Sequence, residues 1–336
     1  MRTAGFVTFV SLALIGCGGG GGGETSSVGA TTATHVVTSL ASVPSNGAVS
    51  LAVANGRVYF TDQNASSVHS VPVAGGAVTT HVTMFESFWP VRYAGDTLYL
   101  LGRRNAGGLF SIADSSVDAT SADLIWRAAF ESSPVWLTLD ESNIYWATDD
   151  YDVATTRYKV RIYAIPLAGG AVRLVGTIAG QHALRIAHAG SDLYVAAGAA
   201  SGGGIFRLPK SGGPALALFT TTADGPTDIW VKNNLLYFFY SGLYVYDLAT
   251  GASKPLWTSP TQVDGELYVD DAHIYWTEAN RSGRVEFGGG TGAVRRIPIG
   301  SGPVETLYTG TWSWDIIGDA TSIYWAAGLT ILKTTK

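Results

Sequence analysis

One short pattern recurs along the chain: an aliphatic residue, a tyrosine, and then an aromatic or aliphatic residue. The clearest copies are Asn143–Asp149, His273–Glu278 and Ser322–Ala326, and the weaker ones are Val58–Asp62, Leu98–Leu100, Leu193–Val195 and Leu236–Phe238. The tyrosines are Tyr59, Tyr99, Tyr145, Tyr194, Tyr237, Tyr275 and Tyr324, at spacings of 40, 46, 49, 43, 38 and 49 residues. This period is typical of one four-stranded blade of a β-propeller and is too long for ankyrin or leucine-rich repeats.

The residues around each tyrosine share a plan of short strands and tight turns. An alternating segment that ends in a polar turn precedes the tyrosine, as in Val53–Gly56 and Leu137–Asp140. A loop follows it, then a second alternating segment closed by glycines, as in Ile162–Gly170, and a short last strand such as Ala171–Leu174. Period-two alternation between such turns indicates consecutive hairpins. We therefore predict an all-β fold, a seven-bladed β-propeller of four-stranded antiparallel blades.

The last unit ends after its third strand, Leu329–Thr335, which would leave an unpaired sheet edge. Upstream of the first unit, His35–Leu40 resembles the fourth strands of other units, such as Val78–Val82. We predict that an N-terminal strand at about residues 34–41 completes the last blade and closes the ring. A count of six or eight blades would contradict this prediction.

Composition is consistent with a propeller and excludes several classes of protein. Of the 336 residues, 42 are glycine and only 14% are charged, which favours strands joined by tight turns over solvated helices. The net charge of −5 and the lack of a basic cluster argue against a nucleic-acid partner. The length would allow two domains, but the repeat predicts a single propeller domain over residues 34–336.

The N-terminus has the pattern of an export signal. An uncharged, mostly apolar stretch runs from Ala4 to Ile15 and is too short to span a membrane as a helix. Its end, Leu14-Ile15-Gly16-Cys17, resembles a bacterial lipobox, in which cleavage before the cysteine leaves a lipidated N-terminal residue. The resemblance implies a signal peptide at 1–16, a lipidated Cys17 with a Gly/Ser-rich tether at 17–33, and a bacterial envelope protein held at the outer membrane, periplasm or cell surface. The alternative is an ordinary signal peptide in which Cys17 occurs by chance.

The Tyr-Trp-Thr-Asp character of the repeat resembles the YWTD propeller repeats of lipoprotein receptors and bacterial lipoproteins built from similar blades. The resemblance covers most of residues 48–336. Asp62, Asp149 and Glu278 keep the acidic position of the motif, whereas the receptor domains have six blades. The resemblance implies a propeller, and packing of Tyr and Trp between blades also accounts for the motif.

Propeller topology places two kinds of connection on opposite faces. Short turns such as Asn55-Gly56, Gly95-Asp96, Asn233-Asn234 and Gly169-Gly170 belong to one face. We expect long, individual loops on the other face, including Thr148–Tyr158, Glu278–Phe287, Phe85–Pro90 and Trp312–Asp315. Binding residues concentrate on variable loops held by a rigid scaffold, so the loop-rich face is the candidate working face.

Residues that open the innermost strands should converge at the channel mouth on that face. The candidate ligand-binding residues are Trp89, Trp136, His182, Arg185, Asp228, Trp230, Glu266, Trp314 and Asp315. Aromatic walls with a few charged groups suit a sugar, a peptide or another polar ligand. The alternative is that these are rim residues that pack the mouth. Asp149, Asp150 and Asp152 lack the other ligands of a calcium loop, so we expect a solvated acidic loop there.

No catalytic motif occurs in the sequence. It has no G-x-S-x-G elbow, phosphate-binding loop or H-E-x-x-H, and its six histidines lack metal-ligand spacing. We therefore name no catalytic residue, metal or cofactor, and expect a monomeric, lipid-anchored module that binds a protein, peptide or glycan. The alternatives are a lactonase- or lyase-type enzyme with a channel active site, which a divalent ion at Asp228, Glu266 or Asp315 would favour, and a structural partner in envelope assembly.

Overall fold

The structure is a computed structural model that describes residues 35–43, 48–62, 64–84, 88–102, 107–129, 132–152, 157–199, 202–222, 224–259, 263–280 and 290–336. The predicted signal peptide, Cys17 and the tether lie outside these residues, as do parts of the predicted loops at 85–87, 153–156 and 281–289. Within the described ranges every element is a β-strand, and none forms a helix of the length and apolar character that crossing a membrane requires.

The strands form seven antiparallel sheets, which we number as blades in chain order from β2 onward. Blade 1 contains β2 (Ala48–Ala54), β3 (Arg57–Asp62), β4 (Ser67–Pro72) and β5 (Thr79–Thr83), and blade 2 contains β6 (Phe88–Ala94), β7 (Thr97–Gly102), β8 (Gly108–Ala113) and β9 (Asp123–Arg127). Blade 3 contains β10 (Ser132–Leu139), β11 (Asn143–Asp152), β12 (Arg157–Pro166) and β13 (Arg173–Ala179), and blade 4 contains β14 (His182–Ala189), β15 (Asp192–Gly198), β16 (Gly204–Pro209) and β17 (Leu216–Thr220). Blade 5 contains β18 (Asp228–Lys232), β19 (Leu235–Phe239), β20 (Gly242–Asp247) and β21 (Ser253–Thr258). Blade 6 contains the divided inner strand β22 (Val263–Asp264) and β23 (Leu267–Val269), then β24 (His273–Asn280), β25 (Thr291–Pro298) and β26 (Glu305–Thr311). Blade 7 contains β27 (Ser313–Gly318), β28 (Ser322–Ala327), β29 (Thr330–Thr335) and β1 (Thr38–Ser42).

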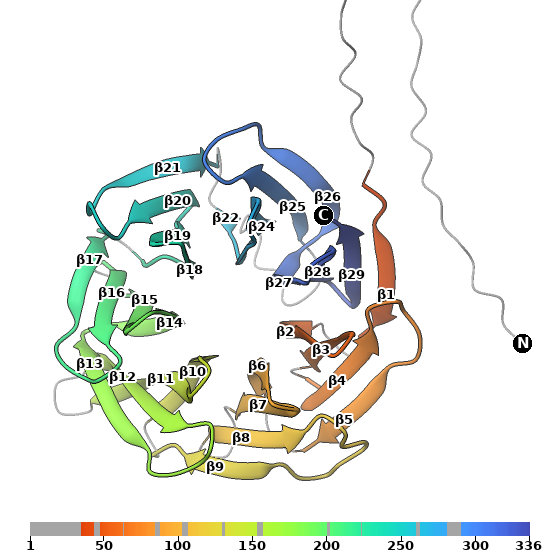
Figure 1. Cartoon of the computed structure of the whole chain (residues 1–336), viewed down its shortest axis with the longest axis horizontal. Helices are drawn as coiled ribbons and strands as arrows, with labels where there is room; N and C mark the ends of the chain where they lie inside the picture. The colour runs from red at the N-terminus through yellow and green to blue at the C-terminus, as the bar shows by residue number, and fades with distance from the viewer. Residues whose placement is uncertain are drawn as a thin grey trace, which may run out of the picture. The chain divides into compact units, whose positions relative to one another are not determined.

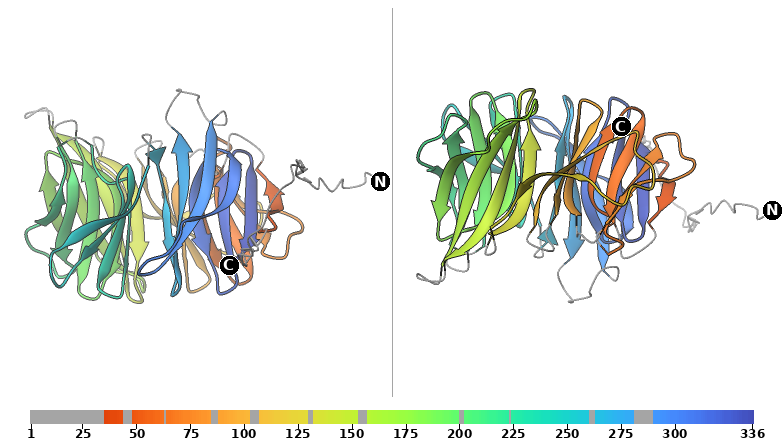
Figure 2. Two further views of the ribbon diagram at one scale, coloured as in Figure 1. Left: turned by 90° about the horizontal axis from the view of Figure 1, so that it is seen from above. Right: turned by 90° about the horizontal axis from the view of Figure 1, so that it is seen from below.

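The seven sheets are arranged around a central channel, with the first strand of each blade innermost (Figure 1). The strands run between the two faces of the ring (Figure 2). Inner strand β2 packs between β27 and β6, so the last blade adjoins the first. The predicted seven-bladed propeller is confirmed.

The ring is closed by an N-terminal strand, as predicted. β1 pairs antiparallel with β29, and its bounds are Thr38–Ser42 instead of 34–41. Leu40, Ala41 and Val43 are buried in one apolar cluster with Tyr324 and Ile331. The backbone N–H of Val43 also donates to the Leu329 carbonyl at 2.8 Å. The first strand, β1, and the last strand, β29, are therefore joined by hydrogen bonds and by burial of apolar side chains.

The seven tyrosines of the repeat are buried in the core, and two of them also hold the turn before their strand. Tyr145 and Tyr324 are each at most 1% exposed. The Tyr145 hydroxyl donates to Asp140 at 3.1 Å, and the Tyr324 hydroxyl donates to Asp319 at 2.6 Å. Each aspartate lies in the turn before the tyrosine strand and also accepts two backbone N–H groups of that turn. The repeat tyrosine is therefore a packing residue, and in blades 3 and 7 its hydroxyl also stabilises the first hairpin of the blade.

The short turns have the backbone that two-residue hairpins require. Asn55 and Gly56 have φ of 47° and 67°, and Asn233 and Asn234 have 49° and 61°. Positive φ at both central residues is the signature of a type I′ turn, whose twist matches that of the flanking strands. These positions explain the choice of Asn and Gly in the turns of this face, which we call the turn face. The opposite face, where the inner strands begin, is the loop face.

Two buried histidines in blade 1 are a source of acid sensitivity. His69 and His81 are 5% and 3% exposed, and their Nε2 atoms lie 2.7 Å from the hydroxyls of Ser67 and Ser70. Burial lowers the pKa of both imidazoles below the ordinary value of 6.5. Above that value both rings are neutral in the native and the unfolded chain. Below it, the unfolded chain binds protons that the native chain excludes, so the histidines lower stability as the pH falls.

We expect the double variant His69→Gln/His81→Gln to lose less stability than the unmodified chain between pH 7.5 and pH 5.5. The difference between the two losses of unfolding free energy should reach about 1 kcal/mol per histidine. This is the proton-linkage contribution of one histidine at a pH one unit below its pKa in the unfolded chain. Urea unfolding followed by tryptophan fluorescence at both pH values measures it. The variant His182→Gln, at a partly exposed ring, is the control. An identical pH dependence in the double variant and the unmodified chain would contradict the assignment.

Candidate functional site

The inner strands bring seven equivalent positions together around the channel. In each blade one residue of the inner strand pairs with the repeat tyrosine of the second strand. The residue two positions before it occupies the same place in every blade. These seven residues, which we call the channel ring, are Ser50, Pro90, Trp136, Arg185, Asp228, Glu266 and Asp315. The residues that follow them are all aliphatic: Leu51, Val91, Leu137, Ile186, Ile229, Leu267 and Ile316. Five of the nine predicted site residues therefore belong to one structural ring.

Six of the seven inner strands are irregular at this ring, and the seventh, β18, begins at it. The register shifts at or beside the ring position in five strands, β2, β6, β10, β14 and β27. β18 begins at Asp228, and the inner strand of blade 6 is divided just before Leu267. Bulges re-aim side chains and are over-represented beside functional sites. The irregularities free the ring side chains from the regular alternation of the sheet.

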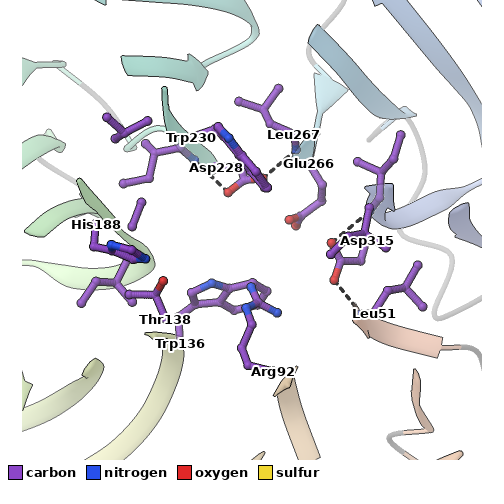
Figure 3. A pocket seen from close by; sticks show the side chains of 16 residues that line it. Leu51, Arg92, Trp136, Thr138, His188, Asp228, Trp230, Glu266, Leu267 and Asp315 are labelled. Carbon is purple, nitrogen blue, oxygen red and sulfur yellow. Dashed lines mark hydrogen bonds between the residues drawn. The ribbon is translucent and has the colours of Figure 1, made fainter. Parts of the chain in front are cut away.

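A cavity of about 300 Å³ lies at the centre of the propeller, and all seven blades line it (Figure 3). The predicted residues that line it are Trp136, Asp228, Trp230, Glu266 and Asp315. Arg92, Thr138 and His188 also line it and were not predicted. The volume is at the lower end of the range for small-molecule sites.

Arg185 is the centre of a buried charge cluster beside this cavity. Its guanidinium pairs with Glu266 through Nη2, and its Nε lies 3.3 Å from Asp228 Oδ1. The same guanidinium lies 3.6 Å from the centre of the Trp136 ring. Burial raises the pKa of Asp228 to about 6 and raises that of Glu266 well above its ordinary value, because one guanidinium does not compensate two buried carboxylates.

Two ring carboxylates also connect adjacent blades. Asp228 Oδ2 accepts the backbone N–H of Leu267 in blade 6 at 2.6 Å, and Asp315 Oδ2 accepts that of Leu51 in blade 1 at 2.8 Å. Asp315 also accepts from the Ser50 hydroxyl and from the backbone N–H of Ile316. These aspartates therefore have a structural role in addition to lining the cavity.

Arg92 supplies the second positive charge of the cavity. Its guanidinium lies 5.0 Å from the centre of the Trp136 ring, and its Nη1 donates to the Val91 carbonyl at 2.8 Å. Among the described residues, no carboxylate lies within 4 Å of it. Arg92 belongs to blade 2 and Arg185 to blade 4, so the two cations approach Trp136 from the blades on either side.

The three other predicted residues lie outside the cavity lining. The Trp89 and Trp314 rings meet edge to face at 6.3 Å, and Trp312 stacks on Trp314 at 4.9 Å. The His182 ring lies 3.8 Å from that of Tyr158, and its Nδ1 is 3.3 Å from Asp149. These residues are at or before the start of inner strands, so they belong to the loop face.

The expectation of a long, solvated acidic loop at 148–158 is wrong at 148–152, where β11 continues, and residues 153–156 lie outside the described residues. β11 and β12 continue as a hairpin with register Asp150↔Lys159 and Asp152↔Arg157. Asp150 is 5% exposed, pairs with Arg161 at 2.5 Å and accepts the Thr148 hydroxyl at 2.9 Å. Asp149 accepts the backbone N–H of Ala183 in blade 4. Asp150 therefore stabilises the hairpin through a cross-strand ion pair, and Asp149 connects the hairpin to blade 4.

Arg92 could have been found from the sequence by aligning the inner strands on the repeat tyrosines. It pairs with Tyr99, two positions after the ring residue Pro90. No group of three or more His, Cys, Asp or Glu side chains in the described part of the chain is arranged to hold a metal ion. What the cavity offers is charge of both signs, an indole wall and hydrogen-bonding groups.

Comparison with known proteins gives the fold but no family. No protein-family profile and no curated sequence matches the chain. The solved WD40 β-propeller domain of Doa1 is similar, with a TM-score of 0.66 and 10% identity, covering 90% of this chain and 97% of that one. The computationally designed Ika8 protein has a TM-score of 0.59 and 10% identity, covering 89% and 99%. A chain of a nidogen/laminin complex has a TM-score of 0.49 and 16% identity, covering 63% and 80%. At such identities the comparisons show architecture alone: the chain has the β-propeller fold.

Proposed function

We propose that the chain is a binding module that receives a polar ligand, a protein, peptide or glycan, on its loop face and at the mouth of the channel. The observation that carries this proposal is the channel ring. The position directly after the channel ring has an aliphatic residue in all seven blades. At the ring position itself the residue type differs from blade to blade, except that two blades share an aspartate. Scaffold packing explains the uniform position. A specialised, asymmetric site explains the diverse one.

The chemistry of the loop face supports a polar, partly flat ligand. Trp312 and Trp314 form a stacked pair, and both are only partly buried. Across the ring, Tyr151 and Tyr158 contact each other at 4.9 Å and are 37% and 40% exposed. Aromatic side chains give large contact area with a polar edge, which suits both sugars and peptides. Propellers host many functions, so the site and not the fold supports this assignment.

The sequence also supports a location for this activity. We propose that residues 1–16 are removed on export, that Cys17 is lipidated, and that residues 17–33 tether the propeller to a membrane of the bacterial envelope as a monomer. Two or more acyl chains are needed for stable anchoring. The module would then present its loop face to partners outside the cytoplasm.

Arrays of peptides and glycans probed with the labelled full-length chain test the binding proposal. We expect a defined set of ligands whose binding falls about tenfold or more, at least 1.4 kcal/mol, in Trp312→Ala and in Tyr151→Ala/Tyr158→Ala. Leu174→Ala and Leu216→Ala are the matched controls, since these exposed apolar residues begin outer strands beside the turn face. Binding that survives the aromatic variants, or an absence of ligands on both arrays, would refute the proposal.

A further inference from the structure

The acidic side of the cavity has two carboxylates for one guanidinium, so one negative charge there is in excess. Asp228 and Glu266 share the single guanidinium of Arg185. Asp228 is further stabilised by the backbone N–H groups of Ile229 and Leu267. The Glu266 carboxylate has only the contact from Arg185 to its Oε1 among the described residues, and it points into the cavity (Figure 3).

The basic side carries one positive charge without a partner. A guanidinium has five N–H donors and keeps its charge in proteins. Arg92 uses one nitrogen, on the Val91 carbonyl, and its planar group lies over Trp136 and points toward the same cavity (Figure 3). Asp315, an acidic neighbour, already accepts three hydrogen bonds. The free donors of Arg92 are therefore available to a ligand.

Arg92 and the Asp228–Glu266 carboxylate pair face one cavity from different blades, and among the described residues no ion pair joins Arg92 to either carboxylate. Arg92 is in blade 2, whereas Glu266 precedes β23 of blade 6, and its position is set by its backbone N–H, which donates to the Thr277 hydroxyl at 3.1 Å. Arg92 lies on inner strand β6, and Glu266 lies in the break between β22 and β23 of the inner strand of blade 6. A ligand that carries both charges can therefore complete two ion pairs at once.

We propose that the cavity binds a small zwitterion of the free α-amino acid class, with its carboxylate on Arg92 and its ammonium group on Glu266. This inference rests on the proposed binding role of the channel mouth and assigns a ligand chemistry to its deepest part. A simple anion would leave the excess negative charge of Asp228 and Glu266 uncompensated, a simple cation would leave Arg92 without an ion pair, and a neutral sugar would leave both. The volume of about 300 Å³ excludes a folded partner from the cavity and admits a single small molecule.

Calorimetric titration of the full-length chain with each of the twenty common free amino acids tests the inference. We expect at least one to bind, and its N-acetyl and carboxamide derivatives to bind about tenfold or more weakly, because each derivative loses one charge-assisted contact. Arg92→Gln and Glu266→Gln should each weaken binding by a similar factor. Arg207→Gln removes an ion pair with Asp192 outside the cavity lining and should leave affinity unchanged.

Three results would overturn the inference: no binding by any of the twenty, equal binding of the derivatives, or unchanged affinity in Arg92→Gln. The derivative comparison uses the unmodified chain, so it decides the matter even where a variant fails to fold. Array binding without amino-acid binding would leave the proposed function standing and remove this inference alone. Amino-acid binding without any binding on the peptide and glycan arrays would support this inference and refute the proposed function, because the protein would then bind small ligands only.

Discussion

Replacing Arg185 by methionine is expected to lower the free energy of unfolding by about 3–5 kcal/mol at pH 7.5, the usual cost of leaving a buried charge without its partner. Arg185 is 7% exposed. Both of its partners, Asp228 and Glu266, directly precede aliphatic residues of the inner strands. The variant Arg185→Met keeps most of the apolar stem, so the loss reports on charge more than on volume. Urea unfolding followed by fluorescence measures it.

The loss in Arg185→Met should shrink as the pH falls from 7.5 to 5. Burial already raises the pKa of Asp228 and Glu266, and removing Arg185 raises both further. A carboxyl group with a raised native pKa binds its proton first in the native state, so falling pH stabilises the native variant relative to the unfolded one. Stability restored in Arg185→Met/Asp228→Asn/Glu266→Gln would confirm the cause. A loss under about 1 kcal/mol, typical of an exposed pair, would contradict it.

Deleting residues 35–43 is expected to remove at least about 4 kcal/mol of stability, because losing even one buried leucine costs 2–5 kcal/mol. The deletion exposes Tyr324 and Ile331, which Leu40 and Val43 cover. It also leaves β29 as an unpaired edge, which can pair with another chain. The free energy of unfolding of a domain is only about 5–15 kcal/mol in total. We therefore expect the shortened chain to lose its cooperative melting transition and to self-associate.

Thermal melting with sedimentation velocity tests the closing strand. Leu40→Ala should give a smaller, graded loss, and deletion of residues 1–33 is the matched control, which should melt as the full-length chain does. A chain without residues 35–43 that stays monomeric and melts within about 2 °C of the control would show that β1 is dispensable, since 1 kcal/mol corresponds to about 2–4 °C in domains of this order.

The architecture was predictable from sequence because its signals are local. Alternation, the repeat tyrosine and the Asn/Gly turns each act within one hairpin, and seven copies reinforce one interpretation. Even closure was visible, since His35–Leu40 has the pattern of a fourth strand. The strand bounds differed by a few residues because pairing of Ala41 with Ile331 depends on a bulge that pattern alone does not show.

The site was predictable only in part because its geometry is not local. Arg92 was missed because the candidate residues were taken from the starts of the inner strands, whereas Arg92 lies further along β6, opposite Tyr99. Asp150 was misread as solvated because its partner Arg161 lies on the facing strand. Trp89 and His182 were grouped with the cavity residues, yet they lie on the loop face beyond it.

By itself, then, the sequence determined the blade count, the closing strand and the two kinds of connection, because hydrophobic period and turn chemistry operate over a few residues. Only the tertiary structure decided which charges meet. Arg185, Asp228 and Glu266 are as much as 81 positions apart in the chain, and they share one ion-pair cluster because ring closure places equivalent positions of different blades around one channel. The same closure leaves Arg92, which has no ion pair among the described residues, facing a cavity whose opposite side has one carboxylate in excess.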